Sequence, residues 1–437
     1  MANFKRREFL KNTTLAAGAL SLVGPATWAG ANDRINVAII GMGGRGGSVM
    51  KTVAALDRVE VVKVCDPDRN RREKWAAELE ALTGKRPAPE VDLRRIMDDP
   101  EIDAVIMTCC NHWHAPAGIL ACQAGKHAYV EKPISHNLKE GRMLVQAARR
   151  YQRVVMGGTQ RRSHPNFRKA IGMIHEGIIG DIYMARWLLC GPRASIGFKK
   201  PTAPPDSLDW NLWRGPAVEQ PYHENLVHYN WHWFWDFGGG EMGNNGSHLV
   251  DICHWGLGRS KGLPTRIDVV GGRFGYRDQA QTPNTLTATH QYPDGTLLVG
   301  EIRGHHTGES TSWHFYGTKG HMRILTGGSF EIFLEGSKKP EPGIGNLPPV
   351  GKGFKKIDRL QFSNFFQAIR EQRPDILNAE IEDIHLSNAF CHLDNISYRL
   401  GRELRFDPET ETFPGDKEAN QLLTRQYHPE FQLPEQV

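Results

Sequence analysis

At 437 residues the chain is too long for one ordinary hydrophobic core, so two domains are expected. Its hydrophobic content of 39% and charged content of 24% are typical of a soluble globular protein. The net charge of +5 comes from scattered basic and acidic residues, which excludes the basic stripe of a nucleic-acid-binding protein, and no apolar run is long enough to span a bilayer.

The first 31 residues are typical of a twin-arginine export signal. The pair Arg6-Arg7 precedes a Phe-Leu-Lys run, a weakly apolar stretch at 13–23 and small residues at 29–31. The alternative is an amphipathic helix that stays on the protein, but the order of these features favours the signal. We therefore predict cleavage after Ala31, passage through the twin-arginine export machinery and a periplasmic mature chain.

Residues 32–158 alternate short apolar runs with segments of helical periodicity. Strands buried on both faces are expected at 35–40, 59–65, 102–108, 127–130 and 154–157. Helices are expected between them, at 45–56, 69–82, 114–124 and 137–150. Strand and helix in alternation predict an N-terminal Rossmann domain, which is a doubly wound parallel sheet.

Residues 159–437 show a different pattern, which predicts a C-terminal substrate-binding α+β domain. A helix at 164–176 and a strand at 182–189 are followed by an irregular segment at 191–230, rich in Pro, Gly and aromatic residues. Consecutive strands over 266–334 predict a mostly antiparallel sheet, with helices near 360–372 and 380–400 on one face. The sheet could supply the face of a homo-oligomer, although no residue pattern specifies one.

The strongest motif is a G-x-G-x-x-G turn between the first strand and the first helix. Gly41, Gly43 and Gly46 are its glycines, with Gly44 and Arg45 between them. Such glycines permit the tight turn and let the backbone approach a pyrophosphate, which then lies at the positive end of the helix. This context predicts a dinucleotide site rather than a merely structural turn.

An acidic residue completes the dinucleotide pattern. Asp66 lies 20 residues beyond Gly46, at the end of the second strand. A carboxylate there accepts hydrogen bonds from ribose hydroxyls and repels a 2′-phosphate, which favours NAD over NADP. Arg69, Arg71 and Arg72 follow closely and leave NADP open as the alternative.

Lys132 is the first catalytic candidate. It belongs to a Glu131-Lys132-Pro133 run at the end of the 127–130 strand, and ligands bind at the carboxyl ends of parallel strands. A lysine there could contact a substrate hydroxyl beside the nicotinamide. The alternative is an ordinary surface ammonium group.

A second cluster lies in the glycine-rich segment 238–255. If this segment is helical, Asn244, His248 and Asp251 share one face. Asp251 then either orients His248 or accepts a structural hydrogen bond. A metal site formed by His248, Asp251 and His254 lacks a fourth ligand, so no metal is predicted. The seven cysteines show no zinc-site spacing either, and we expect mostly free, buried thiols.

Aromatic and histidine residues crowd the segment that leads to this cluster. Aromatic faces suit the C–H faces of sugar rings, and histidine suits hydroxyl groups, although several of these residues must instead pack into the core. His232 and Trp233 are the substrate-binding candidates, and Arg161 lies just past the first domain. The whole set is Trp210, Trp213, Tyr222, His223, His228, Tyr229, Trp231, His232, Trp233 and Trp235.

Together these motifs resemble the Gfo/Idh/MocA oxidoreductase family over most of the chain. The resemblance rests on GMGGRG, the CD pair at 65–66, NHWHAPAGILACQAGKHAYVEKP and GGGEMGNNGSHLVDICHW. It implies that Lys132 and His248 act at the substrate hydroxyl and that Asn244 contacts substrate, with an amide where the family usually has an acid. The export signal is similar to that of the glucose–fructose oxidoreductase branch, which retains its nucleotide.

The resemblance also implies cofactor contacts beyond the glycine turn. Thr108 ends the third apolar strand, and Asn111 and His114 follow it; the family's threonine-proline-asparagine run is changed here to Thr-Cys-Cys-Asn. Glu131 and Lys132 are expected at the nicotinamide end.

The resulting hypothesis is an NAD-dependent oxidoreductase acting on the CH–OH group of a sugar, sugar derivative or cyclitol. His248 would exchange the hydroxyl proton, and Lys132 would stabilise the developing charge on the oxygen. One alternative is a glycoside hydrolase or lyase that works by transient oxidation with tightly bound NAD. Another is a non-catalytic nucleotide- or sugar-binding protein.

Overall fold

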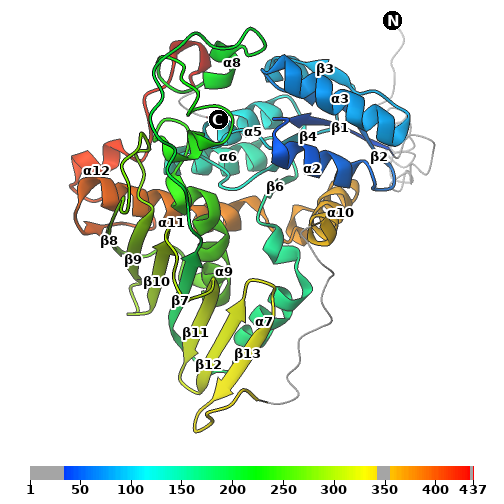
Figure 1. Cartoon of the computed structure of the whole chain (residues 1–437). Coiled ribbons are helices and arrows are strands. Elements are labelled where there is room, and N and C mark those ends of the chain that lie inside the picture. The colour runs from blue at the N-terminus through cyan, green and yellow to red at the C-terminus, as the bar shows by residue number, and fades with distance from the viewer. Residues whose placement is uncertain (1–33, 342–354, 434–436) are drawn as a thin grey trace, which may run out of the picture.

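The computed structural model describes residues 34–341, 355–433 and 437, which form two adjoining α/β units (Figure 1). The export signal predicted at 1–31 lies outside these residues. The N-terminal unit is a six-stranded parallel sheet in the order β3-β2-β1-β4-β5-β6. Its strands are β1 (Ile35–Ile40), β2 (Val59–Cys65), β3 (Ala88–Glu90), β4 (Ala104–Met107), β5 (His127–Val130) and β6 (Val155–Gly157).

This topology confirms the predicted doubly wound sheet. The chain runs outward from β1 through β2 to β3, and then returns to β4 on the other side of β1. The carboxyl ends of β1 and β4 therefore flank a topological switch point, where open α/β sheets bind ligands. The helices of this unit are α2 (Gly44–Val53), α3 (Arg69–Thr83), α4 (Leu93–Met97), α5 (Asn111–Gln123) and α6 (Leu138–Arg150).

The C-terminal unit is an eight-stranded sheet in the order β13-β12-β11-β7-β10-β9-β8-β14. Its pairings are antiparallel except for β10 with β7, which confirms the mostly antiparallel prediction. Its strands are β7 (Ile182–Cys190), β8 (Arg266–Gly272), β9 (Thr285–Gln291), β10 (Leu297–Arg303), β11 (Ser312–Gly317), β12 (Gly320–Leu325), β13 (Phe330–Leu334) and β14 (Leu404–Arg405).

Helices cover one face of this sheet and join it to the first unit. Buried and less buried side chains alternate along β9 and β10, because only one face packs against helices. Helix α11 contacts both β8 and α6, so it lies between the two units (Figure 1). The α-helices are α7 (Pro165–His175), α8 (Trp210–Arg214), α9 (Ser247–Leu257), α10 (Lys355–Glu371), α11 (Ile381–Leu400) and α12 (Lys417–Gln421).

Shorter helical turns complete the described chain. Five are 3₁₀ turns and η3 is a π-helical turn. They are η1 (Gln160–Ser163), η2 (Asn230–Trp233), η3 (Met242–Gly246), η4 (Arg259–Lys261), η5 (Pro374–Ile376) and η6 (Pro429–Phe431).

Helix α10 returns to the Rossmann unit although it lies far along the chain. It packs beside α2 (Figure 1), and the rings of Phe362 and Phe365 lie 4.5 and 6.0 Å from the ring of Tyr129 on β5. The first hydrophobic core therefore contains side chains from both ends of the described chain.

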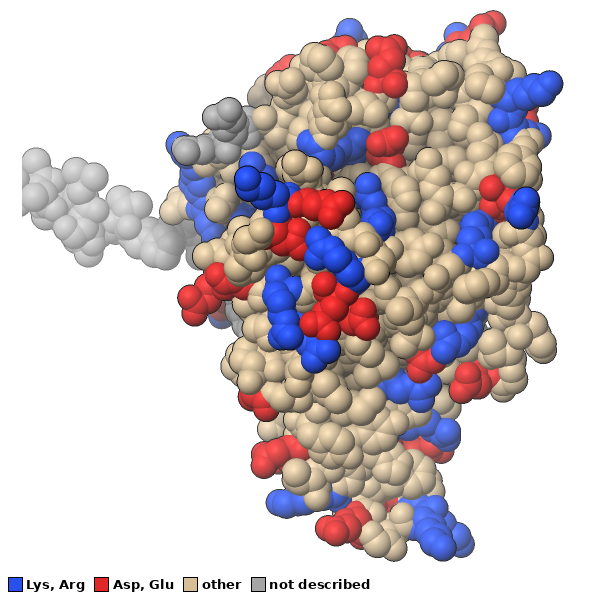
Figure 2. All heavy atoms as spheres, turned by 90° about the vertical axis from the view of Figure 1, so that its left-hand side faces the viewer, with Lys and Arg blue, Asp and Glu red and all other residues tan. Residues whose placement is uncertain are grey.

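The surface carries charges of both signs (Figure 2), and the cysteines are free thiols. On the face shown in Figure 2, basic and acidic side chains are interspersed without a continuous basic stripe. Within the described ranges, no helix has both the length and the apolarity that a bilayer span requires. All seven cysteines are free, and Cys65, Cys122, Cys253 and Cys391 are buried.

Candidate active site

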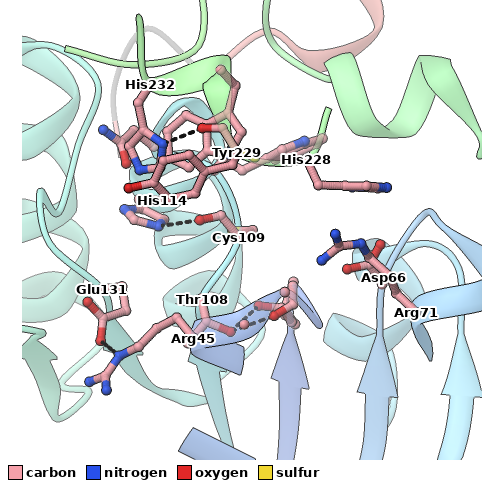
Figure 3. Close-up of a pocket in the computed structure, with 18 of the residues that line it drawn as sticks. Arg45, Asp66, Arg71, Thr108, Cys109, His114, Glu131, His228, Tyr229 and His232 are labelled. Atoms are coloured by element: carbon pink, nitrogen blue, oxygen red, sulfur yellow. Dashed lines mark hydrogen bonds and ion pairs between the residues drawn. The ribbon is translucent and has the colours of Figure 1, made fainter. Parts of the chain in front are cut away.

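A cavity of about 930 Å³ opens where the predicted motifs meet. Its walls include residues that follow β1, β2, β4, β5 and β6, together with residues of the C-terminal unit. Figure 3 shows Arg45 and Glu131 on one side, Asp66 and Arg71 on the other, and His228, Tyr229 and His232 above them. The parallel sheet thus collects residues from distant motifs around one space.

The glycine turn has the shape that a pyrophosphate requires. Gly41 has φ +91°, and a Cβ there would lie 2.4 Å from the Cys109 nitrogen. A Cβ on Gly46 would lie 2.0 Å from the Gly41 oxygen, so both positions need glycine. At Gly44, the first residue of α2, a Cβ would meet nothing within 4 Å, and both Gly43 and Gly44 line the cavity. The helix therefore presents its positive end to open space.

Asp66 lies beside the glycine turn, directly after the end of β2. Its Oδ2 accepts from the Met42 nitrogen at 2.7 Å and its Oδ1 from the Asp68 nitrogen at 2.9 Å. Burial is the main cause that raises the pKa of Asp66 from 3.8 to about 6. Of the three arginines that follow, only Arg71 lines the cavity, whereas Arg72 donates to the Asp66 carbonyl oxygen at 3.1 Å.

The residues predicted after β4 shape the cavity wall. Thr108 donates from Oγ1 to the Gly41 oxygen at 2.7 Å and so braces the glycine turn. The ring nitrogens of buried His114 lie 2.6 Å from the Pro133 oxygen and 3.0 Å from the Cys109 oxygen. Burial lowers the pKa of His114. The ring lies between the loops that follow β4 and β5 and contacts a backbone oxygen of each. Asn111 begins α5 and also lines the cavity.

Arg45, in α2, links the Rossmann unit to α10 at this site. Its Nε donates to Glu131 at 2.7 Å, and its Nη1 donates to Asp358 of α10 at 2.7 Å. Both carboxylates are buried and line the cavity. Sequence reasoning missed Asp358, because it lies within an ordinary amphipathic helix and belongs to no motif.

Lys132 reaches across the cavity wall to the second cluster. Its Nζ lies 2.8 Å from the Asn244 carbonyl oxygen and 3.5 Å from Asn244 Oδ1. Asn244 sits in the π-helical turn η3 rather than in the continuous helix expected, and such turns are frequent at functional sites. Burial lowers the pKa of Lys132. The predicted pair therefore meets, with Lys132 fixed by a backbone oxygen.

His248 lies one turn later, near the start of α9, and lines the same cavity. Its pKa lies well below 6.5, first because of burial and then because of the charges of Lys132, Arg161 and Arg45. Its Nδ1 is buried and has no hydrogen-bond partner among the described residues. The imidazole is therefore neutral and free to accept a hydrogen bond from a ligand.

Asp251 has the structural role, one of the two interpretations that the sequence left open. Its carboxylate accepts from Nε and Nη2 of buried Arg162 at 3.0 and 2.8 Å. His254 is likewise engaged, with Nε2 3.0 Å from the Gly262 oxygen. In the described part of the chain, no group of three or more ligand-type side chains could hold a metal ion.

Residues 191–237, which we call the roof segment, extend from the C-terminal unit over the Rossmann edge. The Asp209 nitrogen donates to the Pro67 oxygen at 3.1 Å, and the Arg69 nitrogen donates to the Ser207 oxygen at 2.8 Å. His228 Nε2 lies 3.0 Å from an oxygen of Asp68. These contacts attach the roof segment to the Rossmann unit beside Asp66.

Several aromatic residues of the roof segment line the cavity, and some of these also belong to its apolar cluster. Trp231 and His232 stack with ring centres 3.6 Å apart and both line the cavity, as does Tyr229. Trp233 is not among the described lining residues; it is buried beneath Arg193, whose guanidinium lies 5.4 Å from the ring centre. The apolar cluster of the segment contains Leu208, Trp213, Ala217, Tyr222, Leu226, Trp231, Phe234 and Phe237.

Two family models match the chain. One, described as "Oxidoreductase family, NAD-binding Rossmann fold", matches residues 35–159. The other, described as "Oxidoreductase family, C-terminal alpha/beta domain", matches residues 196–433. The two matches correspond to the two units of the fold.

Curated proteins similar to the chain include several named glycosyl hydrolase family 109 protein. One from Akkermansia muciniphila is 29% identical over 155 residues, covering 34% of this chain and 32% of the relative. One from Shewanella baltica is 27% identical over 206 residues, covering 42% of this chain and 45% of the relative. Each match therefore spans less than half the length of the relative.

Solved structures share the whole architecture. A levoglucosan dehydrogenase in complex with NADH has a TM-score of 0.63 at 19% identity, covering 85% of this chain and 99% of its own. The WlbA dehydrogenase from Bordetella pertussis, in complex with NADH and UDP-GlcNAcA, has a TM-score of 0.65 at 19% identity, covering 86% and 98%. At these identities the likeness shows the fold.

Proposed function

Because the chain belongs to the Gfo/Idh/MocA oxidoreductase family, with an NAD-binding Rossmann unit, we propose that it transfers a hydride at a CH–OH group of a sugar, sugar derivative or cyclitol. One observation carries this proposal. Lys132, Asn244 and His248 line the same cavity as the glycine turn, and Glu131, the neighbour of Lys132, lies on the side away from Asp66 (Figure 3). The dinucleotide and a polar reaction centre thus share one enclosed space.

The residues present fit NAD. The open space before α2 suits a pyrophosphate, and the carboxylate of Asp66 suits ribose hydroxyls. When bound, the nicotinamide ring supplies the hydride acceptor or donor. Glu131 and Lys132, at the tip of β5, would lie beside that ring and set the substrate oxygen against it.

His248 and Lys132 divide the handling of the substrate hydroxyl. Neutral His248 accepts the hydroxyl proton while the neighbouring carbon loses its hydride, so that the CH–OH group becomes a carbonyl. The Lys132 ammonium, held by the Asn244 backbone oxygen, donates to the same substrate oxygen and stabilises negative charge on it. The side-chain amide of Asn244 orients a neighbouring hydroxyl. Reduction uses the same groups in reverse.

Glycoside cleavage by transient oxidation is the second candidate. The roof segment supports it, because its contacts with Pro67, Asp68 and Arg69 enclose the adenosine end of the cavity. A cofactor held under such a cover could be reduced and reoxidised in place. The names of the curated relatives point in the same direction.

The two candidates differ in what accumulates. Purified protein, loaded with NAD, is mixed with free sugars, sugar acids and nitrophenyl glycosides. Net oxidation leaves reduced nicotinamide at the end of the reaction, whereas transient oxidation releases nitrophenol with none left. Release of nitrophenol from protein freed of NAD would contradict both candidates.

We further propose that the mature protein acts in the periplasm after twin-arginine export. This proposal rests on the sequence of residues 1–31. A protein that needs NAD outside the cytoplasm would have to fold around it before export, which is the route that twin-arginine signals serve.

A further inference from the structure

Three buried polar atoms without partners belong to side chains that line the cavity. They are Gln160 Oε1, Arg161 Nη1 and His248 Nδ1, each buried and without a hydrogen-bond partner among the described residues. All three residues line the cavity. Buried polar atoms are nearly always hydrogen-bonded, so a ligand is the natural partner for such a group. The proposed mechanism uses His248 and leaves the other two unassigned.

Arg161 differs from the other arginines around it. Arg45 and Arg71 also line the cavity, but Arg45 pairs with Glu131 and Asp358, and Arg71 lies 3.9 Å from an Asp68 oxygen. The adjacent Arg162 pairs with Asp251. Within the described residues Arg161 has no ion pair, because the nearby Asp251 is already occupied by Arg162.

Aromatic rings surround the Arg161 guanidinium where a carboxylate would be expected. Its carbon Cζ lies 4.7 Å from the centre of the Trp313 ring and 5.9 Å from that of Phe167. Such contacts compensate a buried cation only in part. Burial lowers the pKa of Arg161 to about 10, so the group is still charged at neutral pH.

The field at this end of the cavity is therefore positive. Lys132 and Arg161 are both cationic, and both act on the pKa of His248. The lining carboxylates of Glu131 and Asp358 are held by Arg45. Glu241 also acts on the pKa of Lys132, but its carboxylate is paired with Arg193. An anionic group on the substrate would meet one unpaired guanidinium, whose planar fork matches a carboxylate.

The geometry points to a carboxylate subsite formed by Arg161, with the Gln160 amide beside it. We infer that the substrate is a sugar acid, a uronate or an aldonate, whose carboxylate pairs with Arg161 while a hydroxyl faces Lys132 and His248. Gln160 hydrogen-bonds a hydroxyl next to the carboxylate. This inference rests on the proposed function for the position of the reacting carbon, but the binding of the carboxylate requires no turnover.

The test is a calorimetric comparison of matched acid and neutral sugars on the NAD-loaded protein. The probes are glucuronate and gluconate against glucose, and galacturonate and galactonate against galactose. The parent protein should bind at least one acid about tenfold or more tightly than its neutral partner. Arg161→Gln should abolish that preference, and Arg161→Lys should retain part of it, because the charge remains without the planar fork.

A matched control separates this role from cofactor binding. Arg71→Gln removes another cavity-lining arginine, from the Asp66 end, and should leave the acid preference unchanged. Equal affinity of the parent for acids and neutral sugars, or no binding of any acid in the panel, would overturn the inference. So would an Arg161→Gln protein that keeps the preference but loses NAD affinity, since Arg161 would then serve the nucleotide. Oxidation of neutral sugars alone would contradict the carboxylate subsite and leave the hydride transfer standing.

Discussion

His248 combines two properties that suit it to proton exchange. Burial and neighbouring cations keep the imidazole neutral, and its Nδ1 lacks a partner in the described chain. In the proposed mechanism the same cations would stabilise an oxyanion on the substrate and so favour loss of the hydroxyl proton. Lys132 is fixed by the Asn244 carbonyl oxygen, which aims the ammonium group before substrate binds.

We predict that Lys132→Ala and His248→Ala each retain the fold and NAD binding but lose turnover. The expected loss in kcat is about 10² to 10⁴, the usual effect of removing a group that handles a proton or charge in the transition state. Asn244→Ala should be milder, because an amide does not titrate at neutral pH. Steady-state kinetics on any accepted substrate provide the measurement.

A double variant checks whether the two groups act on one oxygen. If they act as a unit, Lys132→Ala combined with His248→Ala should be little worse than the worse single variant. Near-normal turnover in either single variant would remove that residue from the mechanism.

Asp66 gives the site a pH dependence on the acidic side. Its pKa of about 6 in the free protein means that the carboxyl group is neutral below that pH. Ribose hydroxyls bind the ionised form more strongly, so NAD affinity should rise with pH up to about 6 and then level off. Titration of NAD between acidic and neutral pH measures this, and Asp66→Asn should give a weaker, flat profile. A parent profile without the acidic fall would show that Asp66 does not contact the ribose as an anion.

The residues of the site were predictable from sequence to the extent that they belong to local motifs. The glycine turn follows strand β1, Lys132 follows strand β5, and His248 follows a glycine-rich segment. The sheet topology brings these motifs together around one cavity. Asp358 and the pairing of Asp251 with Arg162 were not predictable, because each depends on contacts between distant segments. That Arg161 has no ion pair among the described residues also depends on packing alone.

Among the elements, the apolar strands were the easiest to predict. Strand β1 and strand β5 match their expected bounds, since all residues of β5 and all but Asn36 of β1 are buried. Strand β3 was missed because its three residues include a proline and none is buried. The π-helical turn η3 interrupts an otherwise helical pattern, and periodicity does not reveal where a turn widens.

The roof segment is the element most directly tied to cofactor retention. His228 contacts Asp68 at 3.0 Å, and His228→Ala removes that link between the roof and the Rossmann edge. A hydrogen bond to a charged group contributes about 1.5–3 kcal/mol, so we predict that NAD dissociates roughly tenfold faster or more from the variant. Stopped-flow displacement of bound NAD gives the rate.

Lys199→Ala provides the matched control in the same segment. Lys199 pairs with Glu224 at an exposed position and does not line the cavity, so its loss should leave the NAD dissociation rate unchanged. Equal rates for parent and His228→Ala would show that the roof does not hold the cofactor.

At the scale of the whole molecule, the two units share a hydrophobic core and line the same cavity. Helix α10 completes the core of the Rossmann unit, and the roof segment closes over its ligand edge. The two fold types were predicted from the sequence. The packing of α10 and of the roof segment against the Rossmann unit was not, because it depends on which apolar faces meet after folding. Because residues of both units line this cavity, binding of the cofactor and binding of the substrate should be coupled.

Export belongs to the same scale, since twin-arginine cargo crosses the membrane folded. We predict that replacing Arg6 and Arg7 with lysine leaves folded, NAD-loaded protein in the cytoplasm. Cell fractionation with immunodetection measures its location, and a cytoplasmic marker protein controls for lysis. Normal periplasmic yield of the variant would refute the targeting role of this pair.

Hydride transfer within the cavity is tested most directly by rapid mixing of the NAD-loaded protein with a substrate deuterated at its CH–OH carbon. Absorbance of reduced nicotinamide and mass analysis of the released cofactor are followed in parallel. We predict that the absorbance rises in the parent protein and that deuterium appears on the nicotinamide. His248→Ala should show neither while still holding NAD. For a glycoside cleaved by transient oxidation, the absorbance should rise and then decay. Conversion of the substrate with flat absorbance and no deuterium on the cofactor would show that no hydride passes between substrate and nicotinamide.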